Sequence, residues 1–598
     1  MQRAAIEYRI QPSHPAAHLF AVSCTVHAPD PEGQVLRLPA WIPGSYMIRE
    51  FARNIVRIRA EADGREWPLD KLDKHSWQAA ALPPGVALVL HYEVYAWDLS
   101  VRAAHLDTTH GFFNGSSVFL AVEGQRDQAC LVDILRPEGS AFRDWKLATA
   151  LSPAHASRKV RGHGFGLYRA ENYDELIDHP VEMGCFSAVR FEAGGAVHEV
   201  VLTGRHDCDL NRLAADLKRI CEWQIALFGA PPPMDYYLFL VMAVDEGYGG
   251  LEHRASTALL CSRADLPWAG MKKMSDGYRG FLGLCSHEYF HTWNVKRIKP
   301  AAFLPYDLTR ENYTALLWAF EGFTSYYDDL ALVRSGVIER DDYLALLGKT
   351  ISSVLRGSGR LKQSVAESSF DAWTKYYRQD ENAPNAIVSY YSKGSLIALA
   401  LDLRLRAESG GALTLDDLMR SLWKDYGSGE RGVAEDGVFA AVRALGGERL
   451  GPRLARWLKK AVEGRDDLPL ARLLKPFGIE VRNEAGSTAP VLGVKLAASD
   501  SAARLASVYD DGPAQLAGLS AGDVLVAIDG LRVDAKNLDG RLARCSAGDE
   551  IEVHAFRRDE LMCFRLQLAA APADQVRLEA SARPGAAALR LRQDWLGN

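Results

Sequence analysis

Residues 287–291 read His-Glu-Tyr-Phe-His, and these residue types at this spacing can bind a metal and activate water. On a helix, residues four apart share a face, so His287 and His291 can direct two imidazoles at one ion. Glu288 then stands beside the ion with a carboxylate for a bound water. Imidazole suits zinc, and two such ligands leave positions for a third residue and water. The spacing predicts a Zn²⁺ site; a chance match on an ordinary helix is the alternative.

A third ligand is expected in the run Tyr313–Leu330, which is apolar through Phe320, contains no proline and predicts a largely buried helix. Glu321 lies in its middle, where a carboxylate is costly unless it is paired or bound to a metal. A buried Lys or Arg partner is the alternative. Gly322 would let another backbone or a substrate come close. Asp328, two turns along the same face, is a candidate acceptor for a ligand imidazole N–H, with Asp329 as its competitor.

The strings 287–298 and 317–327 together resemble the glycyl aminopeptidase family of zinc metallopeptidases. More broadly, the pattern is similar to thermolysin-like enzymes with a Glu as third ligand. The resemblance implies one Zn²⁺ per chain, bound by His287, His291 and Glu321. It also implies a multidomain α+β fold: an N-terminal β-rich domain, a thermolysin-like, mainly helical zinc domain and a C-terminal PDZ domain.

Gly249-Gly250-Leu251-Glu252-His253 resembles the exopeptidase motif of related aminopeptidases, with Leu251 and His253 departing from it. The resemblance implies that Glu252 holds the free α-amino group of the substrate, while the backbone at Gly249 and Gly250 aligns the peptide. The segment follows residues 236–244, which predict a buried strand, and an edge strand here would suit strand addition. A solvated carboxylate after a turn is the alternative for Glu252.

Tyr391-Ser-Lys-Gly394 resembles the Y-x-K-G segment of the same enzymes, in which the Tyr donates its hydroxyl to the oxyanion of the tetrahedral intermediate. Tyr391 is therefore the expected donor. Tyr390, or the pair Tyr376 and Tyr377, could serve instead, because tyrosines in helices are more often core residues than catalysts.

These assignments predict a zinc aminopeptidase that hydrolyses the N-terminal peptide bond of peptides with a free amino terminus. Glu288 takes the proton of the attacking water and passes it to the leaving amine. The family resemblance implies a preference for small residues such as Gly or Ala. A zinc endopeptidase to which the PDZ domain recruits substrates, and a non-catalytic peptide-binding scaffold, are the alternatives.

The composition is that of an ordinary globular protein, with 48% hydrophobic and 24% charged residues in 598. A net charge of −6 without blocks of one sign argues against nucleic acid or a membrane as partner. No apolar run reaches eighteen residues, and the first ten residues lack the apolar core of a secretory signal. The nine Cys form no C-x-x-C pair, which favours a reducing compartment and a cytoplasmic location.

We expect three domains: residues 1–170 β-rich, 171–480 the zinc peptidase with a helical C-terminal part, and 485–575 the PDZ domain. Alternating residues predict strands at 19–27 and 88–95, and a helix is expected at 210–228, closed by Gly229. Helical spacing recurs around residues 415–423 and 438–462. Residues 41–53 resemble a signature of the family's N-terminal domain, with turn chemistry at Pro43-Gly44 and no assigned catalysis.

Residues 511–530 resemble the glycine-rich run of bacterial-type PDZ domains. Such domains bind a C-terminal or extended peptide by adding it as a strand. The expected capture loop is Leu492-Gly493-Val494. A packed structural appendage without a ligand is the alternative.

Overall fold

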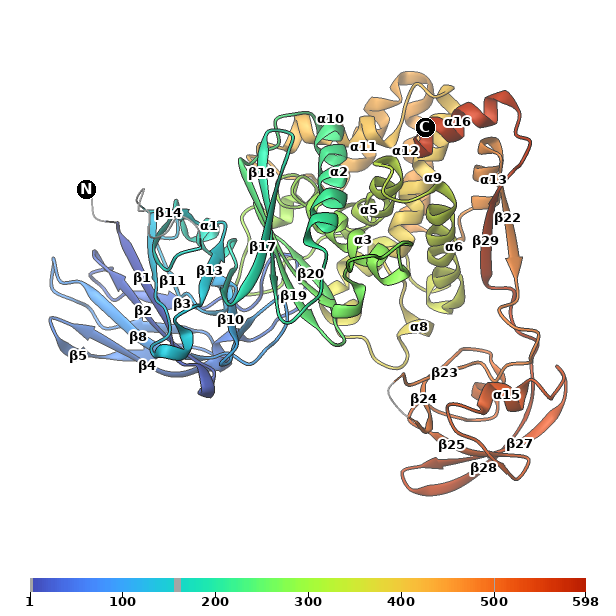
Figure 1. Cartoon of the computed structure of the whole chain (residues 1–598), viewed down its shortest axis with the longest axis horizontal. Helices are drawn as coiled ribbons and strands as arrows, with labels where there is room; N and C mark the ends of the chain where they lie inside the picture. The colour runs from blue at the N-terminus through green and yellow to red at the C-terminus, as the bar shows by residue number, and fades with distance from the viewer. Residues whose placement is uncertain (1–3, 155–162, 499–500, 598) are drawn as a thin grey trace. The chain divides into compact units, whose positions relative to one another are not determined.

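The computed structural model describes residues 4–154, 163–498 and 501–597, and Figure 1 traces its elements along the chain. The chain divides into two compact units. The first consists of Met1–Asn312, Ser335–Val337 and Trp423–Gly432, and the second of Tyr313–Arg334, Ile338–Leu422 and Val433–Asn598.

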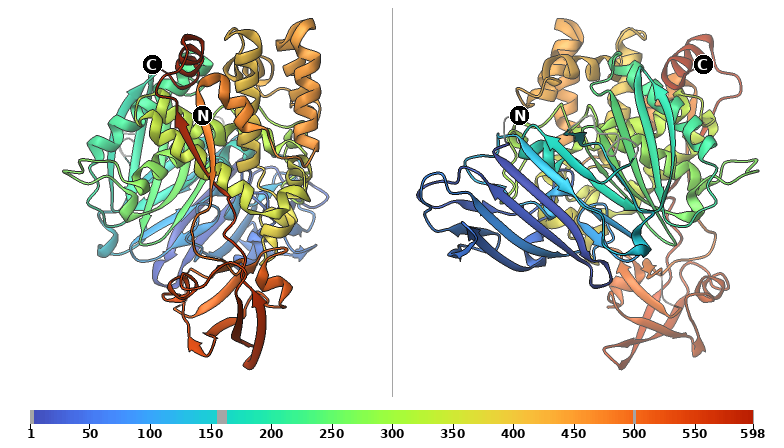
Figure 2. Two further views of the ribbon diagram at one scale, coloured as in Figure 1. Left: turned by 90° about the vertical axis from the view of Figure 1, so that its right-hand side faces the viewer. Right: turned by 60° about the vertical axis from the view of Figure 1, so that its left-hand side comes forward.

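The N-terminal part of the first unit is built from β-sheets, drawn in blue in Figure 2. Its largest sheet has eight strands, and β1 pairs antiparallel with β2 but parallel with β12. Buried and exposed side chains alternate along β1 and β8, as one-face burial of a sheet requires. The strands in sheet order are β14 (Ser152–Pro153), β15 (Gly166–Ala170), β12 (Cys130–Ile134), β1 (Ile6–His14), β2 (Leu19–Val26), β8 (Leu88–Tyr95), β4 (Ile55–Ala62) and β5 (Arg65–Trp67).

Two four-stranded sheets and a short helix, α1 (Tyr173–Ile177), complete this part. The first sheet runs β13 (Lys146–Thr149), β16 (Val181–Gly184), β10 (His110–Phe113), β9 (Ala104–Leu106). The second runs β11 (Ala121–Val122), β3 (Val35–Arg37), β7 (Ser76–Ala79), β6 (Leu69–Lys71). Because β16 lies in the first of these sheets, strands of the N-terminal part extend past residue 170.

A five-stranded sheet forms the second part of the first unit. Its order is β17 (Phe186–Ala193), β18 (Ala196–Thr203), β19 (Tyr236–Val244), β21 (Ser256–Ser262), β20 (Tyr248–Glu252). The central strand β19 is almost entirely apolar and pairs parallel with both neighbours, as expected for a strand covered on both faces. Helix α2 (Leu210–Phe228) contacts β17, and α3 (Asp276–Phe290) contacts β20 and β21.

A buried carboxylate on β18 is fully paired. Glu199 accepts hydrogen bonds from Arg190 Nε at 2.9 Å and from the Tyr236 hydroxyl at 2.7 Å, and His163 Nε2 lies 3.1 Å away. Burial alone would raise the pKa of Glu199, but these three partners outweigh it and lower the pKa to about 2.

The second unit is mainly helical, and α9 lies at its centre, since it contacts α4, α5, α6, α12, α13 and α16. Thirteen of its residues are buried, which fits a helix surrounded by others. The helices are α4 (Leu317–Phe320), α5 (Gly322–Arg334), α6 (Arg340–Arg356), α7 (Val365–Phe370), α8 (Ala383–Ala386), α9 (Ser392–Ser409), α10 (Leu415–Tyr426, in this unit as far as Leu422), α11 (Gly437–Leu445), α12 (Gly447–Glu463), α13 (Leu470–Leu474) and α16 (Ala586–Leu596).

The PDZ domain has its own apolar core under a six-stranded sheet. The sheet runs β23 (Val494–Leu496), β24 (Ala503–Val508), β25 (Val524–Ile528), β27 (Glu550–Arg557), β28 (Glu560–Gln567), with β26 (Leu531–Arg532) paired to β25; the helices are α14 (Pro513–Leu516) and α15 (Leu538–Leu542). Asn385 of α8 bonds this domain with both ends of its amide: Nδ2 donates to Val508 O at 2.8 Å, and Oδ1 accepts from Asp510 N at 3.1 Å.

The chain enters and leaves the PDZ domain through one antiparallel ribbon, β22 (Ile479–Glu484) paired with β29 (Gln575–Ala580). After β29, helix α16 returns to the helical core. Trp595 is fully buried there, and its indole N–H donates to the Tyr326 hydroxyl at 2.9 Å. Arg334 Nε in turn donates to Trp595 O at 2.7 Å.

Several predicted elements are confirmed: β2, β8, β19 and α2 lie where the patterns place them, and Gly229 follows α2 with a φ of 97°. The helical spacing at 438–462 is also confirmed, as two helices, α11 and α12, separated at Gly446. One prediction needs correction: the helix expected at 313–330 begins only at Leu317 and is interrupted at Glu321, giving α4 and α5.

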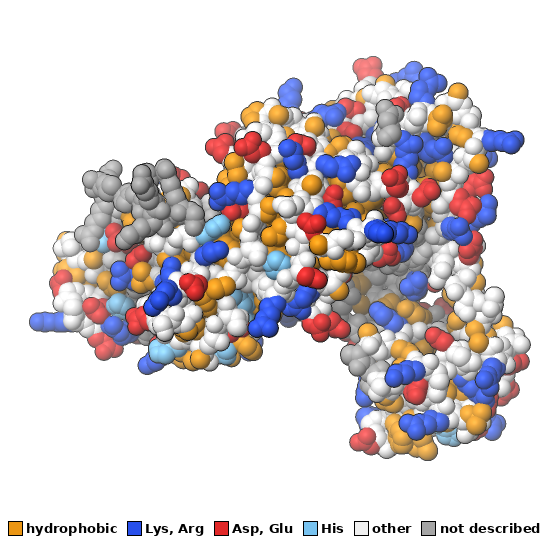
Figure 3. All heavy atoms as spheres, viewed as in Figure 1, with side chains coloured by type: hydrophobic (Ala, Val, Ile, Leu, Met, Phe, Trp, Pro, Cys, Tyr) orange, Lys and Arg blue, Asp and Glu red, His pale blue; other side chains and the backbone are white. Residues whose placement is uncertain are grey.

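The surface carries both signs of charge. On the face in Figure 3, Lys and Arg side chains lie among Asp and Glu side chains over sheets and helices alike. Within the described residues, no helix is both long enough and apolar enough to cross a bilayer.

Candidate functional site

Helix α3 carries the predicted His pair at its C-terminal end. The helix starts at Ser275, whose hydroxyl accepts a hydrogen bond from Tyr278 N, and His291 follows its last residue as the C-cap. The rings of His287 and His291 stand nearly perpendicular, at 83°, and their Nε2 atoms lie 3.1 Å apart. The structure thus directs the ring nitrogens of both residues to one point, as the i, i+4 spacing predicts.

The other nitrogen of His291 is fixed by the backbone. His291 Nδ1 lies 2.7 Å from Asn294 O, and because a carbonyl can only accept, Nδ1 carries the proton. In the neutral ring, Nε2 is then left with its lone pair facing His287. A tight turn holds Asn294 in place: Lys296 N donates to His291 O, and Val295 adopts a φ of 112°, which is strained for a β-branched residue. The sequence gives no local signal for this turn.

Glu288 lies against strand β20, beneath Gly250. An ideal Cβ on Gly250 would lie 2.7 Å from Glu288 Cγ and closer still to its carboxylate, so only glycine leaves room for the acid here. Gly249 is different, because an ideal Cβ there would lie 3.6 Å from Arg102 and 4.0 Å from Val101, which are ordinary contact distances. Of the two predicted glycines, Gly250 therefore determines where Glu288 lies.

Glu252 ends β20, which is an edge strand of the five-stranded sheet, as the sequence suggests. Its side chain is 4% exposed, and oxygens of Glu252 and Glu288 and a nitrogen of His291 all lie within 4.8 Å of one another. Gly44 covers Glu252: at a φ of 95°, its ideal Cβ would lie 2.6 Å from Glu252 Oε2. The Pro43-Gly44 turn of the N-terminal part thus forms a wall beside this carboxylate, a contact that no sequence pattern predicts.

Asp178 fixes the segment after Glu252 and was not predicted. Its carboxylate accepts from Arg254 N at 3.0 Å, lies 3.4 Å from His253 Nδ1, and forms a buried ion pair with Lys296 Nζ at 2.6 Å. Burial would raise the pKa of Asp178, but Lys296, Arg254 and His253 together hold it well below its usual range. Asp178 therefore connects the end of β20 to the turn that supports His291.

In the second unit, Glu321 occupies the joint between α4 and α5 and is 2% exposed. The joint stays helical, because Glu321 N donates to Leu317 O and Ser325 N donates to Glu321 O. Gly322 packs on α9, where its ideal Cβ would lie 2.6 Å from Gly394 Cα. The expected close approach at Gly322 is thus made by another backbone.

All four tyrosines considered from the sequence lie in one cluster of the second unit. Tyr376 ends a π-helical turn, η8 (Ala372–Tyr376), and its ring lies 4.7 Å from that of Tyr390 and 5.5 Å from that of Tyr391. The Tyr377 and Tyr391 hydroxyls are 3.2 Å apart. Burial and then the Glu321 carboxylate raise the pKa of Tyr376, so Glu321 acts electrostatically on this cluster.

The rest of the Tyr391-Ser-Lys-Gly394 segment is structural. Tyr391 is half-buried and caps α9 at its start. Lys393 is buried and donates to Arg360 O at 3.2 Å. Gly394 has no side chain, so the backbone of Gly322 can pack directly against it.

A helix-borne His pair with a neighbouring Glu beside an antiparallel edge strand defines a metallopeptidase. Three family models match: Peptidase M61 N-terminal domain at residues 7–185, M61 glycyl aminopeptidase at 280–397, and PDZ domain at 490–568. A crystal structure of an aminopeptidase N family protein from Idiomarina loihiensis is 44% identical, covers 99% of this chain and 100% of its own, and has a TM-score of 0.93. The chain belongs to the M61 glycyl aminopeptidase family and is a peptidase.

Two more distant similarities cover a smaller part of this chain. An M1 zinc metallopeptidase from Deinococcus radiodurans is 14% identical over 78% of this chain and 96% of its own, with a TM-score of 0.49. A probable periplasmic serine endoprotease, DegP-like, from Brucella suis is 31% identical over 100 residues. That match spans 17% of this chain and only 19% of the length of that relative.

Proposed function

We propose that the protein is a zinc aminopeptidase that removes small residues from peptides with a free amino terminus. The observation that carries this proposal is the approach of Glu252 to Glu288 and His291 within 4.8 Å. The ammonium nitrogen and the carbonyl carbon of one residue are only about 2.5 Å apart. A carboxylate that binds the ammonium must therefore lie this close to the catalytic groups if the first peptide bond is cleaved.

The donor set suits zinc, with His287, His291 and Glu321 as the protein ligands. Ligands about 2.0–2.1 Å from a tetrahedral zinc lie about 3.3 Å apart, and the Nε2 atoms of the His pair are 3.1 Å apart. Two imidazoles and a carboxylate leave one position for water. When bound there, zinc would polarise the scissile carbonyl and lower the pKa of a water molecule.

Each protein side chain then has one role in the reaction. Glu288 takes the proton of the attacking water and returns it to the leaving amine. Glu252 pairs with the substrate ammonium, and β20 aligns the peptide backbone by antiparallel pairing along its free edge. Tyr391 donates its hydroxyl to the oxyanion as negative charge develops. Asp328 as an acceptor for the His287 ring stays a prediction, since Asn294 fills that role for His291.

The preference for small residues follows from the wall beside Glu252. Gly44 approaches the carboxylate so closely that even a methyl group would overlap it, and Ile42 and Tyr46 of the same segment are buried. The ring of Tyr46 stacks on Phe303 at 5.6 Å, which fixes the segment. A substrate with its ammonium on Glu252 therefore has little space for its first side chain, which favours Gly and Ala.

The test compares aminoacyl amides of Gly, Ala, Leu and Phe, each with a free and an acetylated amino group, with and without chelator. We expect cleavage of the free Gly and Ala amides only, abolished by the chelator. Glu288→Gln should remove activity while zinc stays bound, and Glu252→Gln should lower kcat/KM by about 100-fold. Cleavage of the acetylated amides would instead indicate the endopeptidase. Zinc binding without cleavage of any substrate would indicate the scaffold.

The PDZ domain offers a site for a peptide at β23, which lies at one end of its sheet order. In the predicted capture loop, Gly493 adopts a φ of 74°, and its ideal Cβ would lie 3.1 Å from Gly512 Cα. A strand added beside β23 with its carboxylate near this loop is the binding mode that we propose. The cytoplasmic location stays a prediction; the nine cysteines are all free thiols, which fits a reducing compartment.

A further inference from the structure

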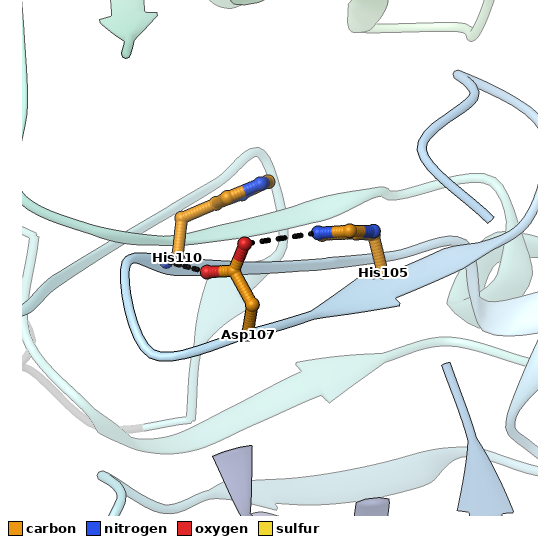
Figure 4. Close-up of side chains that lie close together, drawn as sticks. All are labelled: His105, Asp107 and His110. Carbon is orange, nitrogen blue, oxygen red and sulfur yellow. Dashed lines mark hydrogen bonds and ion pairs between the residues drawn. The ribbon is translucent and has the colours of Figure 1, made fainter. Parts of the chain in front are cut away.

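A second group of metal-ligating side chains lies in the N-terminal part, at the hairpin of β9 and β10. Figure 4 shows His105 from β9, Asp107 from the turn and His110 from β10 lying close together, with the His105 ring directed at Asp107. One ligand atom of each lies within 4.8 Å of the other two. The two imidazole rings are stacked, with centroids 4.9 Å apart, and the side chains of both are buried.

The distances within this group match those between ligands of one ion. His105 Nε2 lies 3.4 Å from Asp107 Oδ2, longer than an ordinary N–H···O hydrogen bond. His110 Nδ1 forms an ion pair with Glu182 Oε1 at 3.3 Å. The separation of His105 Nε2 and Asp107 Oδ2 is close to the edge of about 3.3 Å of a tetrahedron of nitrogen and oxygen around zinc. The His pair of α3 shows a similar separation.

The polar atoms of the group have few other partners. His105 Nδ1 and His110 Nε2 are buried without a partner. Unpartnered buried polar atoms are costly, and a cation that takes one lone pair from each ring lowers that cost. Asp107 Oδ1 is already engaged, because it accepts from Thr109 N and His110 N in the turn. Asp107 Oδ2 remains directed at the two rings, so Asp107 can ligate with one oxygen.

The surroundings favour a closed structural site rather than a second active site. The group borders a cavity of about 20 Å³, which is sufficient for one water molecule. Apolar side chains line most of it, among them Leu99, Phe112 and Leu240. Two imidazoles with one or two carboxylates suit zinc better than calcium or magnesium, which prefer oxygen ligands.

We propose that His105, Asp107 and His110, with a water as fourth ligand, bind a structural zinc ion that holds the two strands of the β9–β10 hairpin together. This ion is additional to the one at the His pair of α3. The proposed ion takes no part in the peptidase reaction. Zinc content and thermal stability, and not activity, therefore test whether it is bound.

The experiment counts zinc per full-length chain by mass spectrometry after zinc loading and dialysis. We expect two equivalents in the unaltered protein, one in His287→Ala/His291→Ala, one in His105→Ala/His110→Ala, and none when all four are replaced. His18→Ala is the matched control and should keep two, because His18 belongs to the same aromatic stack through Trp97 but not to the ligand group.

The variant His287→Ala/His291→Ala leaves the proposed second site unaltered, so a test on it does not depend on whether substitutions at that site disturb folding. Its thermal midpoint should fall when a chelator is added, since only the structural ion remains to be removed. One equivalent in the unaltered protein, no zinc in this variant, or a midpoint that the chelator leaves unchanged would each overturn the proposal.

Discussion

The two adjacent glycines of β20 provide a sharp test of how Glu288 is positioned. A methyl group at position 250 would lie 2.7 Å from Glu288 Cγ, whereas carbon atoms in contact prefer about 3.5–4.0 Å. Gly250→Ala must therefore displace the carboxylate by about 1 Å. A misplacement of this size costs about 100-fold in rate, or about 2.7 kcal/mol of transition-state stabilisation. Gly249→Ala makes no contact nearer than 3.6 Å and should leave the rate within about threefold, the spread expected from ordinary contacts.

The assay is kcat on a free alanyl amide, with zinc content and the thermal midpoint measured on the same samples. Because the methyl group meets a flexible side chain, zinc content and stability should stay close to those of the unaltered protein. If Gly250→Ala retains more than a third of the kcat, or loses no more kcat than Gly249→Ala does, then Gly250 does not determine where Glu288 lies. A loss of zinc would show that the substitution acts on the His pair instead.

Three other substitutions have expected outcomes. Tyr391→Phe should lower kcat by about 100-fold while Tyr390→Phe changes it little, and the reverse ranking would reassign the oxyanion donor. Because the pKa of Glu199 is lowered to about 2, its charge stabilises the fold fully above about pH 4.5, and this contribution is lost as the pH falls toward 2. Urea unfolding of Glu199→Gln at pH 7 should show a deficit of at most about 3 kcal/mol that shrinks at pH 3; a constant deficit would exclude this linkage. Asn385→Ala should speed hydrogen exchange at the Asp510 amide about tenfold, and an unchanged rate would show that the bond does not hold the PDZ domain.

Local patterns were sufficient for much of the fold. The alternation along β2 and β8, the apolar run of β19 and the glycine that ends α2 are signals within one segment. The interruption of the helix at Glu321 is different, because the sequence is apolar on both sides of it. That geometry accompanies the crossing of Gly322 on Gly394, a contact between segments far apart in the chain.

In the candidate site too, features set within one segment could be predicted, whereas features that depend on contacts between distant segments could not. The i, i+4 spacing predicts that His287 and His291 meet, because the helix itself supplies the geometry. Gly44, Asn294 and Asp178 were missed, since each acts through its position in space: one by lacking a side chain, one by a carbonyl and one by a buried ion pair. Buried charges such as Asp178 are visible in a sequence only when a known motif surrounds them.

The helix α16 makes the PDZ domain an insertion rather than a tail. A ribosome must finish the entire PDZ segment before Trp595 exists, so the helical core can take up this residue only after the PDZ segment has been made. For the same reason, a stop codon placed directly after β22 would remove the core residue Trp595 together with the PDZ domain. An internal excision that rejoins β22 to β29 by a short turn is the design that spares the enzyme.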